Sequence, residues 1–118
     1  MSKSANAGEL RTKIYFKEIK SDVDDEGYPS EQEVNVFGDG KYIRCKWVNA
    51  HGTEAFTAMQ LELREPATLT MRYSPKITET LIVYREQDPE PFEVISIDNV
   101  EERNTWLEVK VQRKVPAR

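Results

Sequence analysis

The chain has 118 residues, a length typical of one domain with a single hydrophobic core. Hydrophobic residues make up 38% and charged residues 32%, which predicts a thin core and much exposed or interfacial surface. The net charge of −4 argues against a protein that binds nucleic acid through its overall charge, and no stretch approaches the roughly 18 apolar residues of a membrane span.

Six segments alternate apolar and polar residues with a period of two, which predicts six β-strands. They cover residues 10–16, 42–48, 67–73, 79–85, 92–97 and 105–113. The predicted buried faces carry Leu10, Ile14, Phe16, Ile43, Cys45, Trp47, Leu69, Met71, Tyr73, Leu81, Val83, Phe92, Val94, Leu107, Val109 and Val111. In the fifth strand, Ile95 and Ile97 fall on the face opposite Val94. Turns rich in Pro, Asp and Asn predict antiparallel neighbours, so we expect a mostly β fold, a small antiparallel six-stranded β-barrel.

Residues 52–63 depart from this alternation. Ala55, Ala58, Met59 and Glu62 recur at helical spacing, and Thr53 is a suitable capping residue. The stretch is also compatible with an extended conformation, but a short helix over about 52–62 is favoured. We treat 1–118 as one domain, with residues 1–7 and 115–118 expected to be frayed.

An acidic insertion follows the first strand. Residues 22–33, DVDDEGYPSEQE, contain six acids and neither Lys nor Arg. Their mutual repulsion, together with Gly27 and Pro29, predicts a long mobile loop over 22–40. Two interpretations remain open, a solvated loop and an arm that becomes ordered on a partner. The apolar residues in and beside it would suit an arm, and VNVF at 34–37 could add a strand to a neighbouring sheet.

The residues that usually carry chemistry are scarce. His51 is the only histidine and lies in a loop-like sequence, while Cys45 is expected in the core. The single cysteine excludes an intramolecular disulfide, and the polar start MSKSANAG lacks the apolar segment of a signal peptide, so we expect an intracellular protein. We predict no catalytic residue, cofactor or metal site, and therefore no enzyme.

Lys41, Arg44, Lys46 and Trp47 place cations and an aromatic ring on one strand. An OB-like β-barrel that binds single-stranded nucleic acid uses such a combination, and this is the alternative function. Trp47, however, is predicted on the face opposite Lys46. Charge is also unevenly distributed, because residues 86–102 hold seven acids and no cation, whereas 110–118 hold four cations and no acid. Such segregation suits stacking on copies of the same chain.

The order of short motifs resembles the head-tail joining proteins of tailed bacteriophages and prophages, also called head-closure or head-tail adaptor proteins. The matching motifs are GELRTKI at 8–14, DEGY at 25–28, CKWVN at 45–49, GTE at 52–54, MRY at 71–73, FEV at 92–94, and Asn99, Arg103 and Leu107. Val48 replaces a small residue of the family pattern, and Phe92 replaces a tyrosine. Each motif is short, so the specificity of the resemblance lies in their order over residues 8–113.

The resemblance implies a non-enzymatic ring of about a dozen copies at the neck of the virion. Its partners would be further copies of the chain, the portal and its adaptor, and the tail proteins. DNA would pass through the channel without specific binding. Assembly would take place in the host cytoplasm, and the free protein could remain monomeric until the portal templates the ring.

The family's long loop reaches a neighbouring subunit, which gives 22–40 a role as the inter-subunit arm. Its implied contact residues are Asp25, Glu26, Gly27, Tyr28, Val34, Val36 and Phe37. Trp47, Arg72, Tyr73 and Arg103 are implied structural residues, with Arg72 as an ion-pair partner.

Overall fold

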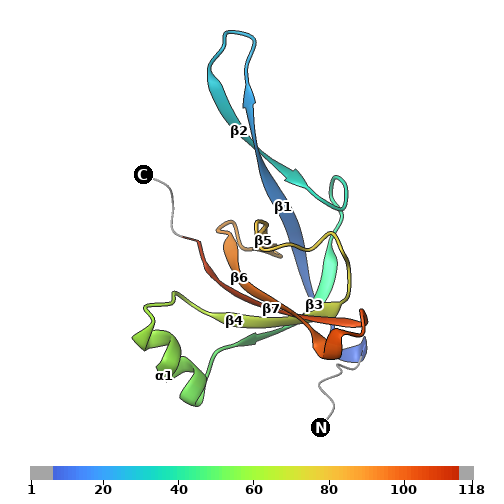
Figure 1. The fold of residues 1–118 in the computed structure, drawn as a ribbon, viewed down its shortest axis with the longest axis vertical. Helices are drawn as coiled ribbons and strands as arrows, with labels where there is room; N and C mark the ends of the chain where they lie inside the picture. Colours follow the sequence, from blue (N-terminus) through green and yellow to red (C-terminus); the bar gives the residue numbers. More distant parts are fainter. Residues whose placement is uncertain (1–6, 115–118) are drawn as a thin grey trace.

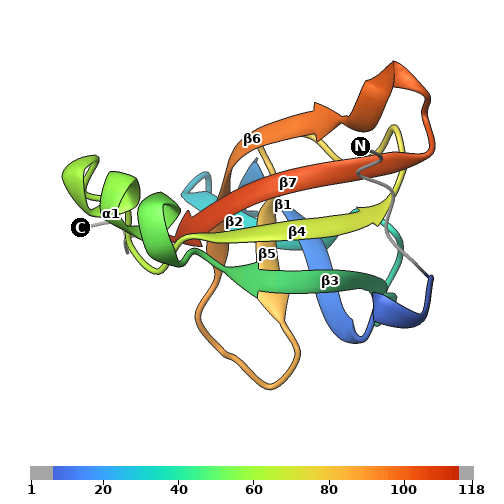
Figure 2. The same ribbon diagram turned by 90° about the horizontal axis from the view of Figure 1, so that it is seen from below.

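The alternating strands close into a barrel. The computed structural model describes residues 7–114, and its elements in chain order are η1 (Ala7–Glu9), β1 (Thr12–Val23), β2 (Pro29–Asn35), β3 (Ile43–Asn49), α1 (Gly52–Gln60), β4 (Ala67–Arg72), β5 (Ile82–Arg85), β6 (Phe92–Asn99), η2 (Val100–Glu102) and β7 (Trp106–Arg113). The barrel follows the order β1-β3-β4-β7-β6-β5, and β5 pairs back with β1 (Figures 1 and 2). All pairings are antiparallel, so the predicted six-stranded barrel is confirmed.

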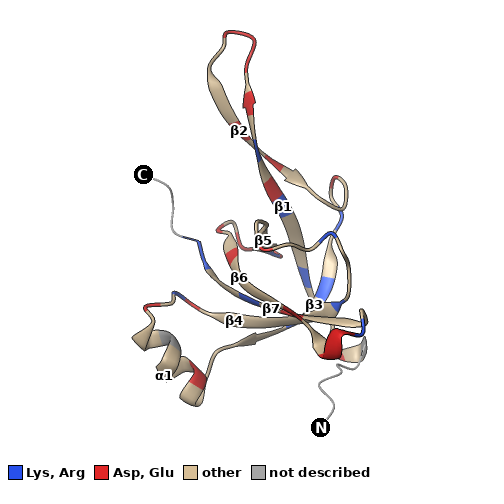
Figure 3. Ribbon diagram, in the orientation of Figure 1, with Lys and Arg blue, Asp and Glu red and all other residues tan. Residues whose placement is uncertain are grey.

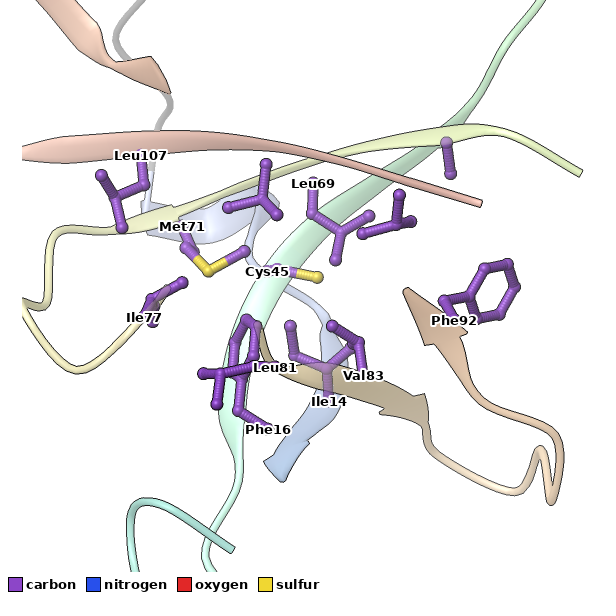
Figure 4. Close-up of a cluster of buried hydrophobic side chains, with 13 residues drawn as sticks. Ile14, Phe16, Cys45, Leu69, Met71, Ile77, Leu81, Val83, Phe92 and Leu107 are labelled. Atoms are coloured by element: carbon purple, nitrogen blue, oxygen red, sulfur yellow. The ribbon is translucent and has the colours of Figure 1, made fainter. Parts of the chain in front are cut away.

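The core fills the inside of this barrel (Figure 4). Its fully buried side chains include Phe16, Leu69, Met71 and Val109, which come from strands far apart in the sequence. Trp47, Tyr73 and Val94 are half-buried and pack against the same cluster. Apart from Leu10, which is buried outside this cluster, the inward residues predicted from the alternation therefore do converge on one core.

One prediction about the buried faces is wrong. The register between β6 and β7 shifts between Val94 and Ser96, which marks a β-bulge. A bulge adds one residue and reverses the alternation beyond it, so Ile97 as well as Val94 packs against the core. Ile95 is 38% exposed.

The acidic insertion also differs from its prediction. Residues 22–40 were expected to form an irregular loop, but β1 continues to Val23 and β2 covers Pro29–Asn35. β1 pairs with β3 over 12–14, with β5 over 14–17 and with β2 over 17–23. One long strand therefore joins the barrel to a hairpin that projects beyond it (Figure 1).

The helix α1 confirms the favoured interpretation of residues 52–62. It connects β3 to β4 and lies beyond the barrel end of these strands (Figure 2). Its apolar side chains are largely exposed, with Phe56 at 61% and Met59 at 76%. The helix therefore contributes little to the core. The fraying expected at the termini lies outside the described residues, except for Ala7, which begins η1.

Candidate functional site

The tip of the hairpin is a compact, well-bonded turn. The Oδ1 atom of Asp24 accepts hydrogen bonds from the backbone N–H groups of Glu26 at 3.0 Å and Tyr28 at 2.8 Å. The N–H of Gly27 donates to the carbonyl oxygen of Asp24 at 2.9 Å, and Gly27 has a φ of +86°. Such a positive φ favours glycine, which explains why Gly27 stands at this position. The sequence DDEG thus builds a defined tip.

The tip presents both charge and apolar surface. Asp25 and Glu26 occupy its centre, and neither forms an ion pair within residues 7–114. Beside them, Val23 is 62% exposed and Tyr28 is 64% exposed. Exposed apolar groups next to unpaired carboxylates are suited to contact with another molecule.

Three predicted arm residues lie at the base of the hairpin instead. Val34 is half-buried, and Val36 and Phe37 pack against the barrel core. The Phe37 ring lies 6.2 Å from the ring of Phe16, measured between centroids. Val36 and Phe37 therefore attach the hairpin to its own barrel, and the exposed apolar residues Val23 and Tyr28 are at its tip.

A hydrogen bond between β5 and β2 braces the hairpin base. The Tyr84 hydroxyl donates to the Glu33 carboxylate at 2.7 and 2.9 Å, and Lys17 Nζ lies 4.9 Å from the Tyr84 ring centroid. Burial, and then the bond to Glu33, raise the pKa of Tyr84 to about 12. Because the folded-state pKa exceeds the ordinary value of 10, the stabilisation is fully present below pH 10 and is lost as the pH rises through 12.

We expect Tyr84→Phe to loosen the hairpin while leaving the barrel folded. Loss of one hydrogen bond to a carboxylate should cost about 1 kcal/mol. Urea unfolding would measure this cost, and hydrogen exchange would show faster exchange at the β2 amides. Tyr15→Phe is the matched control, because no hydrogen bond of the Tyr15 hydroxyl is seen in the described part of the chain. Equal β2 protection in both variants would contradict the brace.

The implied structural residues take different roles. Trp47 packs edge-on against Phe92, with 4.9 Å between ring centroids, and its Nε1 donates to Asn49 Oδ1 at 2.9 Å. Arg72 is exposed and stacks on Trp106 at 5.4 Å from the ring centroid, without an ion pair among residues 7–114. Among residues 7–114, the one ion pair of Arg103 is with neighbouring Glu101, at 3.3 Å. The ion pair expected of Arg72 is therefore not found within the described chain.

Arg113 links β7 to the segment before β4 and to the β5–β6 loop, and the sequence analysis did not predict this role. Its Nε lies 2.9 Å from Glu65 and its Nη1 lies 2.9 Å from both Asp88 and the carbonyl oxygen of Glu90. The guanidinium also lies 4.1 Å from the Phe92 ring centroid. Arg113 falls at an inward-facing position of the β7 alternation. A cation at an inward-facing position was the feature of the sequence that could have identified it.

The groups that might carry chemistry are not assembled into a reactive site. Burial raises the pKa of the Cys45 thiol to about 12, which keeps it protonated. His51 precedes α1, and its Nδ1 lies 3.2 Å from the carbonyl oxygen of Asn49. Within residues 7–114, no three His, Cys, Asp or Glu side chains are placed to hold a metal ion.

Comparison with known proteins decides the class. The family model described as phage head completion protein matches residues 5–114. The chain belongs to this family. The head-closure resemblance of the sequence motifs is thereby confirmed. Membership supports a structural role in closing the phage head and implies a place at the neck of the virion.

A solved structure shares the fold of this head completion protein. The solution structure of protein SF1141 from Shigella flexneri 2a is similar, with a TM-score of 0.66 and 19% sequence identity. The match covers 96% of this chain and all of that one. A search of curated proteins gave no match. Across residues 7–114, no helix is long and apolar enough to span a membrane.

Proposed function

We propose that this head completion protein forms a ring of about a dozen copies at the portal and adaptor exit. The ring closes the channel after DNA packaging and receives the tail. The β1–β2 hairpin is its inter-subunit arm, with Asp25, Glu26, Gly27 and Tyr28 at the contact. Val34, Val36 and Phe37 fix the direction in which the arm leaves the barrel.

The observation that carries this proposal is the projecting hairpin. The molecule measures 57 × 32 × 27 Å, and its long dimension contains the hairpin (Figure 1). Beyond Lys17, β1 pairs only with β2, and no residue of 18–34 joins the buried core. A strand pair that adds nothing to the core but carries a defined tip is well suited to reach a neighbouring subunit.

The surroundings of Trp47 argue against the alternative function, binding of single-stranded nucleic acid. Trp47 packs on Phe92 inside the barrel and is covered by Arg85, whose guanidinium lies 4.7 Å from the indole. A base cannot stack on this ring without displacing Arg85. In the proposed ring, DNA passes without specific binding, which suits a chain of net charge −4.

Electron microscopy of the protein assembled with a portal and its adaptor tests the proposal. We expect closed ring density below the adaptor, with the hairpins bridging adjacent copies. The double variant Asp25→Asn/Glu26→Gln, which retains the turn, should weaken this density. Absence of density below the adaptor in the unmodified protein would overturn the proposed ring.

A further inference from the structure

Three cations form a row across the outer face of the barrel. Lys13 of β1 lies directly opposite Arg44 of β3. Lys46 pairs with Thr70, and continuing this register places Arg44 opposite Arg72 of β4. Arg44 and Arg72 line a common hollow of about 430 Å³ with Leu10, Tyr42 and Ile43. We call Lys13, Arg44 and Arg72 the cationic row.

This row lacks neutralising acids. Among residues 7–114, none of its three members forms an ion pair, and the nearby Glu9 is engaged by Lys46 at 2.8 Å. Lys13 and Arg44 instead share the Tyr42 ring, at 4.8 and 5.7 Å from its centroid. Like charges directly opposite one another destabilise a sheet, and cation–π contacts at exposed sites offset only part of that cost. An anionic partner that covers the row would therefore relieve this repulsion.

The hairpin has the complementary charge. Residues 18–34 contain seven acids and one lysine, so their net charge is −6, whereas that of the whole chain is −4. The remainder of the chain is therefore net +2. Figure 3 shows acids at the hairpin end of the molecule and cations along the barrel part of β1 and β3.

The hairpin cannot cover the row of its own chain. Lys13 and the tip lie on the same continuous strand, β1, which runs from Thr12 to Val23. Eleven residues separate Lys13 from Asp24, which corresponds to about 36 Å along an extended strand. The two complementary surfaces therefore face different molecules.

We propose that the cationic row of one copy receives the hairpin tip of the next copy, giving a head-to-tail contact. This inference rests on the proposed ring and identifies its receiving surface. Asp25 and Glu26 meet Lys13, Arg44 and Arg72. The exposed Val23 and Tyr28 lie against the apolar wall of the hollow formed by Leu10, Tyr42 and Ile43. The row spans three strands, or roughly 10 Å, which matches the end of a two-stranded hairpin.

A second copy suits the row better than a nucleic acid does. Proteins that bind duplex DNA through charge typically neutralise about 6 to 10 phosphates, whereas this row offers three cations. A phosphate backbone would also approach a chain whose hairpin carries a net charge of −6. A head-to-tail contact, by contrast, pairs both charged surfaces at once and can close into a ring.

Cross-linking between two variants, each with one added cysteine, tests the contact. Val23→Cys places a thiol beside the tip, and Thr70→Cys places one beside the row, and neither changes a charge. Cys45 is buried and its pKa is raised to about 12, so it does not compete for a maleimide. We expect a mixture of the two variants to give heterodimers with a bismaleimide of about 10 Å reach at low salt, and much less at high salt.

Four further variants make the result specific. Met59→Cys lies on α1, which joins the ends of β3 and β4 opposite Arg44 and Arg72; its side chain is 76% exposed and it should not cross-link to Val23→Cys. Adding Arg44→Glu/Arg72→Glu to the Thr70→Cys protein should lower the yield roughly tenfold. The Thr70→Cys protein with Arg64→Glu, an exposed change at the end of β4 opposite Arg72, should retain it. Asp25→Lys/Glu26→Lys in the Val23→Cys protein should restore cross-linking to the charge-reversed receiver.

Three results would overturn the inference. They are a cross-linking yield that is the same at position 59 as at position 70, a yield unaffected by charge reversal, and a loss of binding to labelled DNA on charge reversal without any change in the cross-link. Because cross-linking is read in solution and again in the portal-bound assembly, ring density without the cross-link would refute this contact and leave the ring intact. Missing ring density would refute the proposed function instead.

Discussion

Arg113→Met is expected to lower the free energy of unfolding by about 2 kcal/mol, because it removes the guanidinium donor to one oxygen of the partly buried Asp88 carboxylate and to the Glu90 carbonyl oxygen. The Arg113 side chain is only 14% exposed and joins the segments before β4 and between β5 and β6. Asp88, its better shielded partner, is 28% exposed, whereas Glu65 is 66% exposed and should contribute little. Urea unfolding at neutral pH would measure the loss.

The pH dependence gives a second measure of the same variant. The backbone N–H of Glu90, and then the Arg113 guanidinium, hold the pKa of Asp88 below its ordinary value of 3.8. A lowered folded-state pKa stabilises the protein above the ordinary value, and this contribution is lost as the pH falls through the folded-state pKa. We therefore expect the difference between wild type and Arg113→Met to shrink in acid.

Arg103→Met is the matched control for Arg113→Met. Its side chain is 73% exposed and pairs only with nearby Glu101. We expect a change within about 0.5 kcal/mol, as is usual for an exposed ion pair. Equal losses in the two variants would show that the contacts of Arg113 do not hold the loops to the barrel.

Removal of the hairpin is expected to abolish ring assembly while leaving the barrel folded. Lys17 and Asn35 are directly opposite, so residues 18–34 can be replaced by a two-residue Asn-Gly turn. The deleted residues include no member of the buried core, and the anchors Val36 and Phe37 remain. Circular dichroism should show a melting temperature within about 8 °C of wild type, since the deletion removes strand pairings outside the core and the Tyr84–Glu33 hydrogen bond.

Electron microscopy with the portal and adaptor would then report the functional loss. We expect no ring density from the shortened chain, and partial density from Asp25→Asn/Glu26→Gln, which keeps the hairpin but removes its central charges. Full ring density from the shortened chain would rule out the hairpin as the arm. An unfolded shortened chain would show that the barrel depends on the hairpin for its stability.

Local pattern explains which features were predictable. The alternation through Leu107, Val109 and Val111 is long and regular, and it reported both the strand and its buried face. The bulge at Ile95 was missed because one extra residue leaves no distinct mark in so short a segment. The β2 strand was missed because its many charges suggested disorder, whereas an exposed hairpin needs only cross-strand pairing and a suitable turn at Asp24–Gly27.

The sequence by itself determined the barrel strands, the acidic segment and the family resemblance, because these depend on residues close together in the chain. Only the tertiary structure decided that Lys13, Arg44 and Arg72 stand side by side, since strand register joins positions dozens of residues apart. It likewise decided that Arg113 bridges Glu65 and Asp88. The separation between the acidic tip and the cationic row is also a property of the tertiary structure, because Lys13 lies near one end of the continuous strand β1 and the tip follows its other end.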